Sequence, residues 1–68
     1  MLNINKADRM IEELEIMAED NYYPIENNEY YDKMIDMVET ADFNGESFVD
    51  KEDFTQLYCS VKKAIKNW

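Results

Sequence analysis

Residues 50–68, DKEDFTQLYCSVKKAIKNW, decide the fold class of this chain. Their apolar residues recur at three- and four-residue spacing, so a helix would gather them within about 100° of arc on one side. These residues are Phe54, Leu57, Tyr58, Val61, Ala64, Ile65 and Trp68. Asp50 followed by Asp53 is typical of a helix N-terminus, where a short acidic side chain accepts from free backbone amides. The stretch predicts an amphipathic helix over about residues 50–66.

Two segments upstream have the same spacing of apolar residues. In residues 5–20 the apolar positions are Ala7, Met10, Ile11, Leu14, Met17 and Ala18. In residues 27–41 they are Tyr30, Tyr31, Met34, Ile35, Met37, Val38 and Ala41. We expect Asn5 to cap the first helix, and Pro24, Asn27 or Asn28 to begin the second.

The chain has only one glycine and one proline, which suits long helices. We therefore predict an all-α fold, a small three-helix bundle with helices at about 5–20, 27–41 and 50–66, in a single acidic domain over residues 1–68. The expected core is Leu14, Met34, Val38, Leu57, Val61 and Ile65. An alternative is an α+β fold, in which residues 22–23 and 47–49 form a short ribbon.

The composition excludes several classes of site. The chain has no histidine and one cysteine, so a Ser-His-Asp triad, a histidine-liganded metal, an intramolecular disulfide and a thiolate zinc cluster are all impossible. No run approaches the about 18 apolar residues that span a membrane, and the N-terminus lacks the apolar region of a signal peptide. We expect a cytoplasmic protein that is not an enzyme and uses no cofactor. Cys59 is expected to be a reduced, partly exposed thiol without a role.

The distribution of charge is the main indication of function. Sixteen Asp and Glu against seven Lys and Arg give a net charge of −9, and every acid lies in residues 1–53. Helical spacing places Asp8, Glu12, Glu15 and Glu19 on one face, and Glu29, Asp32, Asp36 and Glu39 on another. Such stripes put a carboxylate every ~5–6 Å, and like charges at this spacing destabilise a helix. They indicate a surface for a basic partner, or else solvated faces that keep the protein soluble.

Apolar and aromatic side chains accompany the acids. Ile16 falls beside the first stripe, opposite the expected core, as an interface anchor would. Tyr22 and Tyr23 lie in a break between helices and suit contacts with arginines. Tyr30 and Tyr31 are expected in the core, with their hydroxyl groups at the surface.

Residues 42–54, DFNGESFVDKEDF, resemble an EF-hand calcium loop and, more closely, the loop and helix of a dockerin repeat. Counted from Asp42, the oxygen ligands that this resemblance implies are Asp42, Asn44, Glu46, Asp50 and Asp53. The sequence departs from the pattern at the sixth position, where Ser47 replaces glycine, and at the twelfth, where Asp53 replaces glutamate.

Taken together, these features favour a small acidic inhibitor that occupies a basic, nucleic-acid-binding surface of a partner protein. In its sharpest form it is a nucleic-acid mimic, with carboxylates in place of phosphates. In size and composition it resembles phage-encoded inhibitors such as anti-CRISPR proteins and other anti-defence factors, a resemblance that implies the host cytoplasm as its location. We expect a monomer that binds neither nucleic acid nor membranes directly. The alternatives are a calcium-binding module using residues 42–53, and a regulatory or structural protein that pairs helices with a partner.

Overall fold

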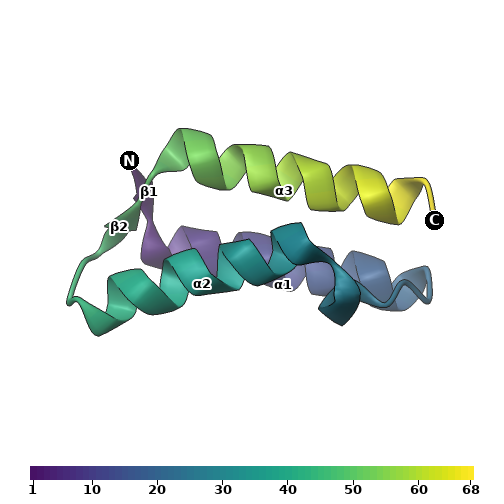
Figure 1. Ribbon diagram of the computed structural model, residues 1–68, viewed down its shortest axis with the longest axis horizontal. Helices are drawn as coiled ribbons and strands as arrows, with labels where there is room; N and C mark the ends of the chain where they lie inside the picture. Colours follow the sequence, from purple (N-terminus) through teal and green to yellow (C-terminus); the bar gives the residue numbers. More distant parts are fainter.

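The computed structural model describes residues 1–68 and is a three-helix bundle with a short two-stranded ribbon (Figure 1). In chain order the elements are β1 (Leu2–Asn3), α1 (Ile4–Asp20), a 3-10 turn η1 (Ile25–Asn27), α2 (Glu29–Phe43), β2 (Phe48–Val49) and α3 (Lys51–Lys66). Helices α1 and α2 lie side by side and α3 lies over both, in a molecule of 35 × 19 × 17 Å. The predicted all-α bundle is confirmed.

Each helix begins at a side-chain cap. Asn3 caps α1, since its Oδ1 accepts from the Asn5 amide at 2.8 Å, so the prediction of Asn5 as the cap was wrong. The extended backbone of β1 delivers Asn3 in the conformation that a cap requires. Asn28, one of the predicted candidates, caps α2, which begins at Glu29. Asp50 caps α3 by accepting from the Asp53 amide at 2.9 Å, as predicted.

Helices α1 and α2 end in the same backbone motif. After α1, the Tyr23 amide donates to the Ala18 carbonyl at 2.8 Å, and Tyr22 has a φ of 55°. After α2, the Glu46 amide donates to the Ala41 carbonyl at 2.8 Å, and Gly45 has a φ of 71°. Both are Schellman motifs, which place a left-handed residue just after the helix. Glycine adopts this conformation without strain, whereas tyrosine does not.

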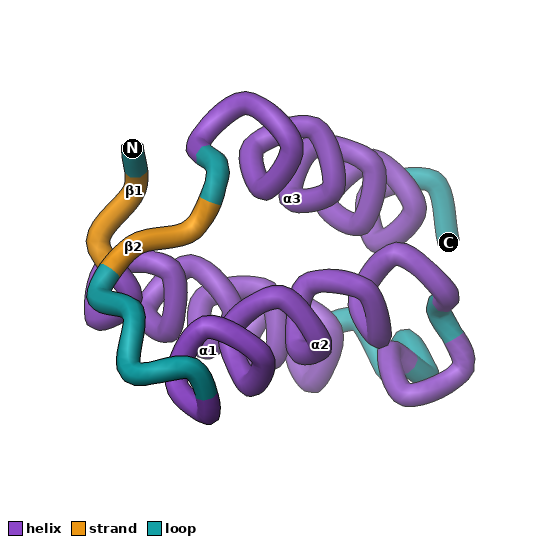
Figure 2. The backbone as a smooth tube through the Cα atoms, turned by 60° about the vertical axis from the view of Figure 1, so that its left-hand side comes forward, coloured by secondary structure: helices purple, strands orange, loops and turns teal.

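The ribbon pairs the N-terminal residues of the chain with the segment between α2 and α3. β1 and β2 are antiparallel, with Leu2 opposite Val49 and Asn3 opposite Phe48 (Figure 2). The alternative sequence interpretation placed residues 47–49 in a ribbon, of which Phe48 and Val49 form β2. It paired them with Tyr22 and Tyr23, which instead form the turn after α1. Leu2 and Val49 are each only 6% exposed, so burial of these two side chains holds the ribbon against the bundle.

The core contains five of the six residues predicted for it, and Leu57 is only partly buried. Phe54, about one turn earlier on α3, is the largest fully buried side chain instead. Tyr30, also predicted in the core, is 46% exposed, and the Lys33 ammonium lies 5.7 Å from its ring centroid. The full core is Leu2, Ala7, Ile11, Leu14, Ala18, Ile25, Met34, Val38, Ala41, Val49, Phe54, Val61 and Ile65.

Candidate acidic interaction surface

A groove of about 290 Å³ runs between α1 and α2 and collects acids from both helices. Its apolar residues are Ile11, Ile35 and Val38, and its acids are Asp8, Glu12, Glu15 and Glu39. All four acids are exposed. We name these seven residues the acidic groove.

Helical periodicity explains how the acidic groove forms. On α1 the acidic stripe lies next to Ile11, which packs toward α2. On α2, Glu39 follows Val38 and points toward α1 rather than toward α3. Because the two helices are antiparallel neighbours, the acidic stripe of α1 lies beside Glu39 of the α2 stripe.

The remaining acids of the two stripes lie elsewhere. Glu19, Glu29 and Asp32 are exposed but do not line the acidic groove. Asp36 lies on the opposite side of α2, where it lines hollows toward β2 and α3. The acidic surface is therefore centred on α1 and the Glu39 edge of α2, and it is narrower than two complete stripes.

Tyr31 ties the two helices together at the acidic groove. Its hydroxyl donates a hydrogen bond to Glu15 Oε2, which joins the start of α2 to the middle of α1. Partial burial, this hydrogen bond and the negative charges of Glu15, Asp32 and Glu26 raise the pKa of Tyr31 to about 12. Its half-buried ring and surface hydroxyl match the prediction for this residue. Glu15 is thus a structural partner as well as a surface charge.

The predicted anchors divide into exposed and structural residues. Ile16 is 61% exposed and Tyr22 is 90% exposed, so both are available to a partner. Tyr23 differs, because it is half-buried and its hydroxyl accepts from Asn28 Nδ2 at 2.7 Å. Its ring also meets Trp68 edge to face, with centroids 5.2 Å apart and planes at 88°. Tyr23 therefore holds the α1–α2 turn against the end of α3.

The residues that resemble a calcium loop are distributed over different elements. Asp42 belongs to the last turn of α2, and Asn44 is the C-cap of that helix. Asp50 is the cap of α3, and Asp53 lies within its first turn. No three acidic or cysteine side chains of the molecule are grouped in a way that could hold a metal ion. The end of α2 thus covers the first two positions of the segment that would form the calcium loop.

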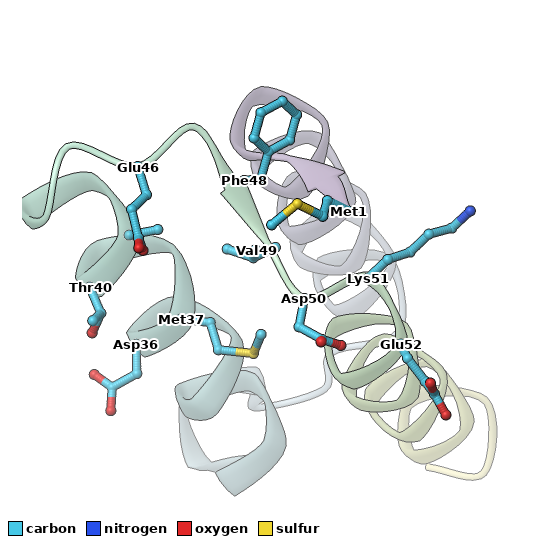
Figure 3. A pocket seen from close by; sticks show the side chains of 11 residues that line it. Met1, Asp36, Met37, Thr40, Glu46, Phe48, Val49, Asp50, Lys51 and Glu52 are labelled. Carbon is cyan, nitrogen blue, oxygen red and sulfur yellow. The ribbon is translucent and has the colours of Figure 1, made fainter.

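The structure has two further surface features. The sequence did not predict the first, and no role was expected for the second. A hollow of about 660 Å³ lies between α2, β2 and the start of α3, and sequence periodicity could not reveal it because the ribbon closes one side (Figure 3). At the other end of α3, the exposed Cys59 lies among Lys62, Lys63 and Lys66 around a basic hollow.

Comparison with family models, with curated proteins and with solved structures gives no match for this chain. None of its helices has the length and apolar character needed to cross a membrane.

Proposed function

We propose that the protein is a small acidic inhibitor that occupies a basic, nucleic-acid-binding surface of a partner protein. The observation that carries the proposal is the acidic groove, in which α1 contributes three carboxylates and α2 contributes one across a shared apolar floor. A basic surface built for a phosphate backbone would meet carboxylates here in place of phosphates. The class of inhibitor that we propose is that of phage-encoded anti-defence proteins, including anti-CRISPR proteins.

Two features favour binding to a partner protein over the alternative that the acids only form a solvated face. The groove combines charge with apolar side chains, as protein interfaces do. Ile16 and Tyr22 add exposed anchors to the same helix and to the turn that follows it. Arginine side chains could pair with the carboxylates and stack on Tyr22.

The test begins with affinity capture from the native host, read by mass spectrometry for nucleic-acid-binding proteins. The partner so identified is then purified and loaded with a fluorescent DNA or RNA duplex. We expect the protein to displace the duplex, and its affinity to fall steeply between about 50 and 200 mM salt.

Two double variants with equal changes in charge distinguish the effect of the acidic groove on binding from the effect of net charge. Glu12→Lys with Glu39→Lys reverses one acid on each wall of the acidic groove and leaves the Tyr31–Glu15 hydrogen bond in place. Glu13→Lys with Asp20→Lys reverses two exposed acids of α1 that lie outside it. The first variant should bind about tenfold or more weakly, mainly through a slower on-rate, and the second should bind nearly as the wild type does.

Equal losses in the two variants would mean that only net charge matters, and would exclude the acidic groove as the binding site. Simultaneous binding of the duplex and this protein to the partner would exclude mimicry. Helix pairing through apolar surface would then be the better account.

A further inference from the structure

The hollow between α2, β2 and the start of α3 has an apolar interior. Its apolar lining consists of Met1, Met37, Ala41, Phe48 and Val49. In Figure 3, the side chains of Met1 and Met37 point into the space around Val49, from the N-terminus and from α2. Phe48 and Met1 remain 46% and 90% exposed, although each is a large apolar side chain. We name this hollow the ribbon groove.

The ribbon groove can accommodate an apolar side chain of a ligand. Its volume of about 660 Å³ lies in the range of natural ligand pockets. Two of its walls are methionines, whose flexible thioethers adapt to an occupant. An apolar group entering here would cover surface that the fold leaves in water.

The rim of the ribbon groove is negative. Asp36, Glu46, Asp50 and Glu52 line it, against two positive groups, the Lys51 side chain and the α-ammonium of Met1. Figure 3 shows the Lys51 side chain directed away from the centre of the groove. One Asp50 oxygen accepts from the Asp53 amide, and the other is available to a ligand. Cationic groups beside an apolar occupant would therefore find complementary charges.

We infer that the ribbon groove is a second docking site, which binds a cationic amphipathic segment of a partner protein: one large apolar side chain flanked by lysines or arginines. This inference goes beyond the proposed function, because it concerns other elements and a peptide-like ligand. Helix α2 separates the two surfaces, with Glu39 on the acidic groove and Asp36 on the ribbon groove. A second copy of this chain is a poorer occupant, since two molecules of net charge −9 repel each other.

The probe is a synthetic helical peptide that carries one tryptophan flanked by lysines, with a control peptide in which serine replaces the tryptophan. Both are titrated into the full-length ¹⁵N-labelled protein and followed by amide chemical shifts. We expect saturable shifts at Met37, Thr40, Glu46 and Val49 with the tryptophan peptide. The serine peptide should bind about tenfold or more weakly, because it lacks the apolar anchor.

Three variants locate the site. Glu46→Lys reverses a rim charge and Thr40→Arg places a long cationic side chain over the groove, and both residues are exposed, so the core is untouched. Each should weaken the tryptophan peptide by about tenfold. Glu13→Lys makes the same change in charge as Glu46→Lys but lies outside every groove, and it should leave the affinity within about twofold.

The two proposals fail separately. The acidic-groove variant Glu12→Lys with Glu39→Lys should still bind the peptide, whatever becomes of displacement of the duplex. The inference is overturned if shifts appear at the acidic groove or evenly over the surface, or if the serine peptide binds equally well. It is also overturned if the same amides shift with protein concentration alone, since a second copy would then be the occupant.

Discussion

Tyr22 and Gly45 occupy equivalent positions in two otherwise similar helix endings, with φ of 55° and 71°. The left-handed conformation is unfavourable by about 1–2 kcal/mol for an L-residue and by almost nothing for glycine. The tyrosine ring is 90% exposed, so it recovers little of that energy by packing. The chain therefore carries local strain at a residue that is available for contact with a partner.

We predict that Tyr22→Gly raises the free energy of unfolding by about 1 kcal/mol, because it removes this strain. Gly45→Ala should lower it by a similar amount, and a Cβ at Gly45 would meet no atom within 4 Å, so the loss is conformational alone. Urea unfolding measures both changes. Tyr22→Ala, which keeps the Cβ, is the control and should differ little from wild type. A lower stability for Tyr22→Gly would show that the ring makes stabilising contacts.

Tyr31 gives a prediction for alkaline pH. Its pKa is raised to about 12 by partial burial and by Glu15, against about 10 in the unfolded chain. Between these values the unfolded chain releases a proton that the folded protein keeps, so stability is complete below about pH 10 and falls as the pH rises toward 12.

Urea unfolding at about pH 9 and about pH 11 tests this, with Tyr31→Phe as the control because it lacks the titrating group. The wild type should lose more stability than Tyr31→Phe over this interval, although it starts about 1 kcal/mol more stable. Equal losses in the two proteins would mean that Tyr31 titrates as in the unfolded chain.

At the scale of elements, Asn28 connects two parts of the molecule. Its Oδ1 accepts from the amides of Tyr30 and Tyr31 at 2.8 and 3.1 Å, and its Nδ2 donates to the Tyr23 hydroxyl. Asn28 is also the only buried polar residue, with 9% of its surface exposed. The start of α2 and the turn after α1 are therefore fixed by one side chain.

We predict that Asn28→Ala lowers the free energy of unfolding by about 2 kcal/mol, through loss of the cap and of the bond to Tyr23. Asn28→Asp should lose less, because a carboxylate still caps the helix and can accept from the Tyr23 hydroxyl. Urea unfolding and hydrogen exchange at the Tyr30 and Tyr31 amides measure these effects. Equal stability of Asn28→Ala and wild type would contradict the assigned role.

The helices were predictable from the sequence because periodic apolar residues and caps are local features. Asp50 is an example, since its bond to the Asp53 amide needs only a separation of three residues. The pairing of the ribbon was not predictable, because Leu2 pairs with Val49 across 47 positions and two residues per strand give no alternation to detect. Asn3 was missed as the cap of α1 for the same reason, since its extended conformation comes from that pairing.

At the scale of the whole molecule, spacing alone identified the acids on each helix but not which of them would meet. Helical geometry places Asp36 and Glu39 in one stripe, yet they line different grooves, because α2 packs against α1 on one side and α3 on the other. Tyr23 was likewise unpredictable as a structural residue, since its contact with Trp68 joins segments 45 positions apart. Such outcomes depend on the packing angles of all three helices.

Salt should change stability and binding in opposite directions, and this prediction tests the acidic surface as a whole. The net charge of −9 and the four acids of one groove repel one another in the folded state. Added salt screens this repulsion within ~8–10 Å, so the melting temperature should rise by a few degrees between about 10 and 150 mM salt. The same screening should weaken attraction to a basic partner.

The two double variants separate the contributions to this effect. Glu12→Lys with Glu39→Lys should show a smaller rise in melting temperature than Glu13→Lys with Asp20→Lys, because only the first relieves crowding of charge at the acidic groove, and both change the net charge equally. Thermal unfolding followed by circular dichroism over a salt series measures the slopes. A wild-type melting temperature that falls with salt would show that attraction dominates within the folded protein. That result would contradict the premise that the acids of the acidic groove repel one another.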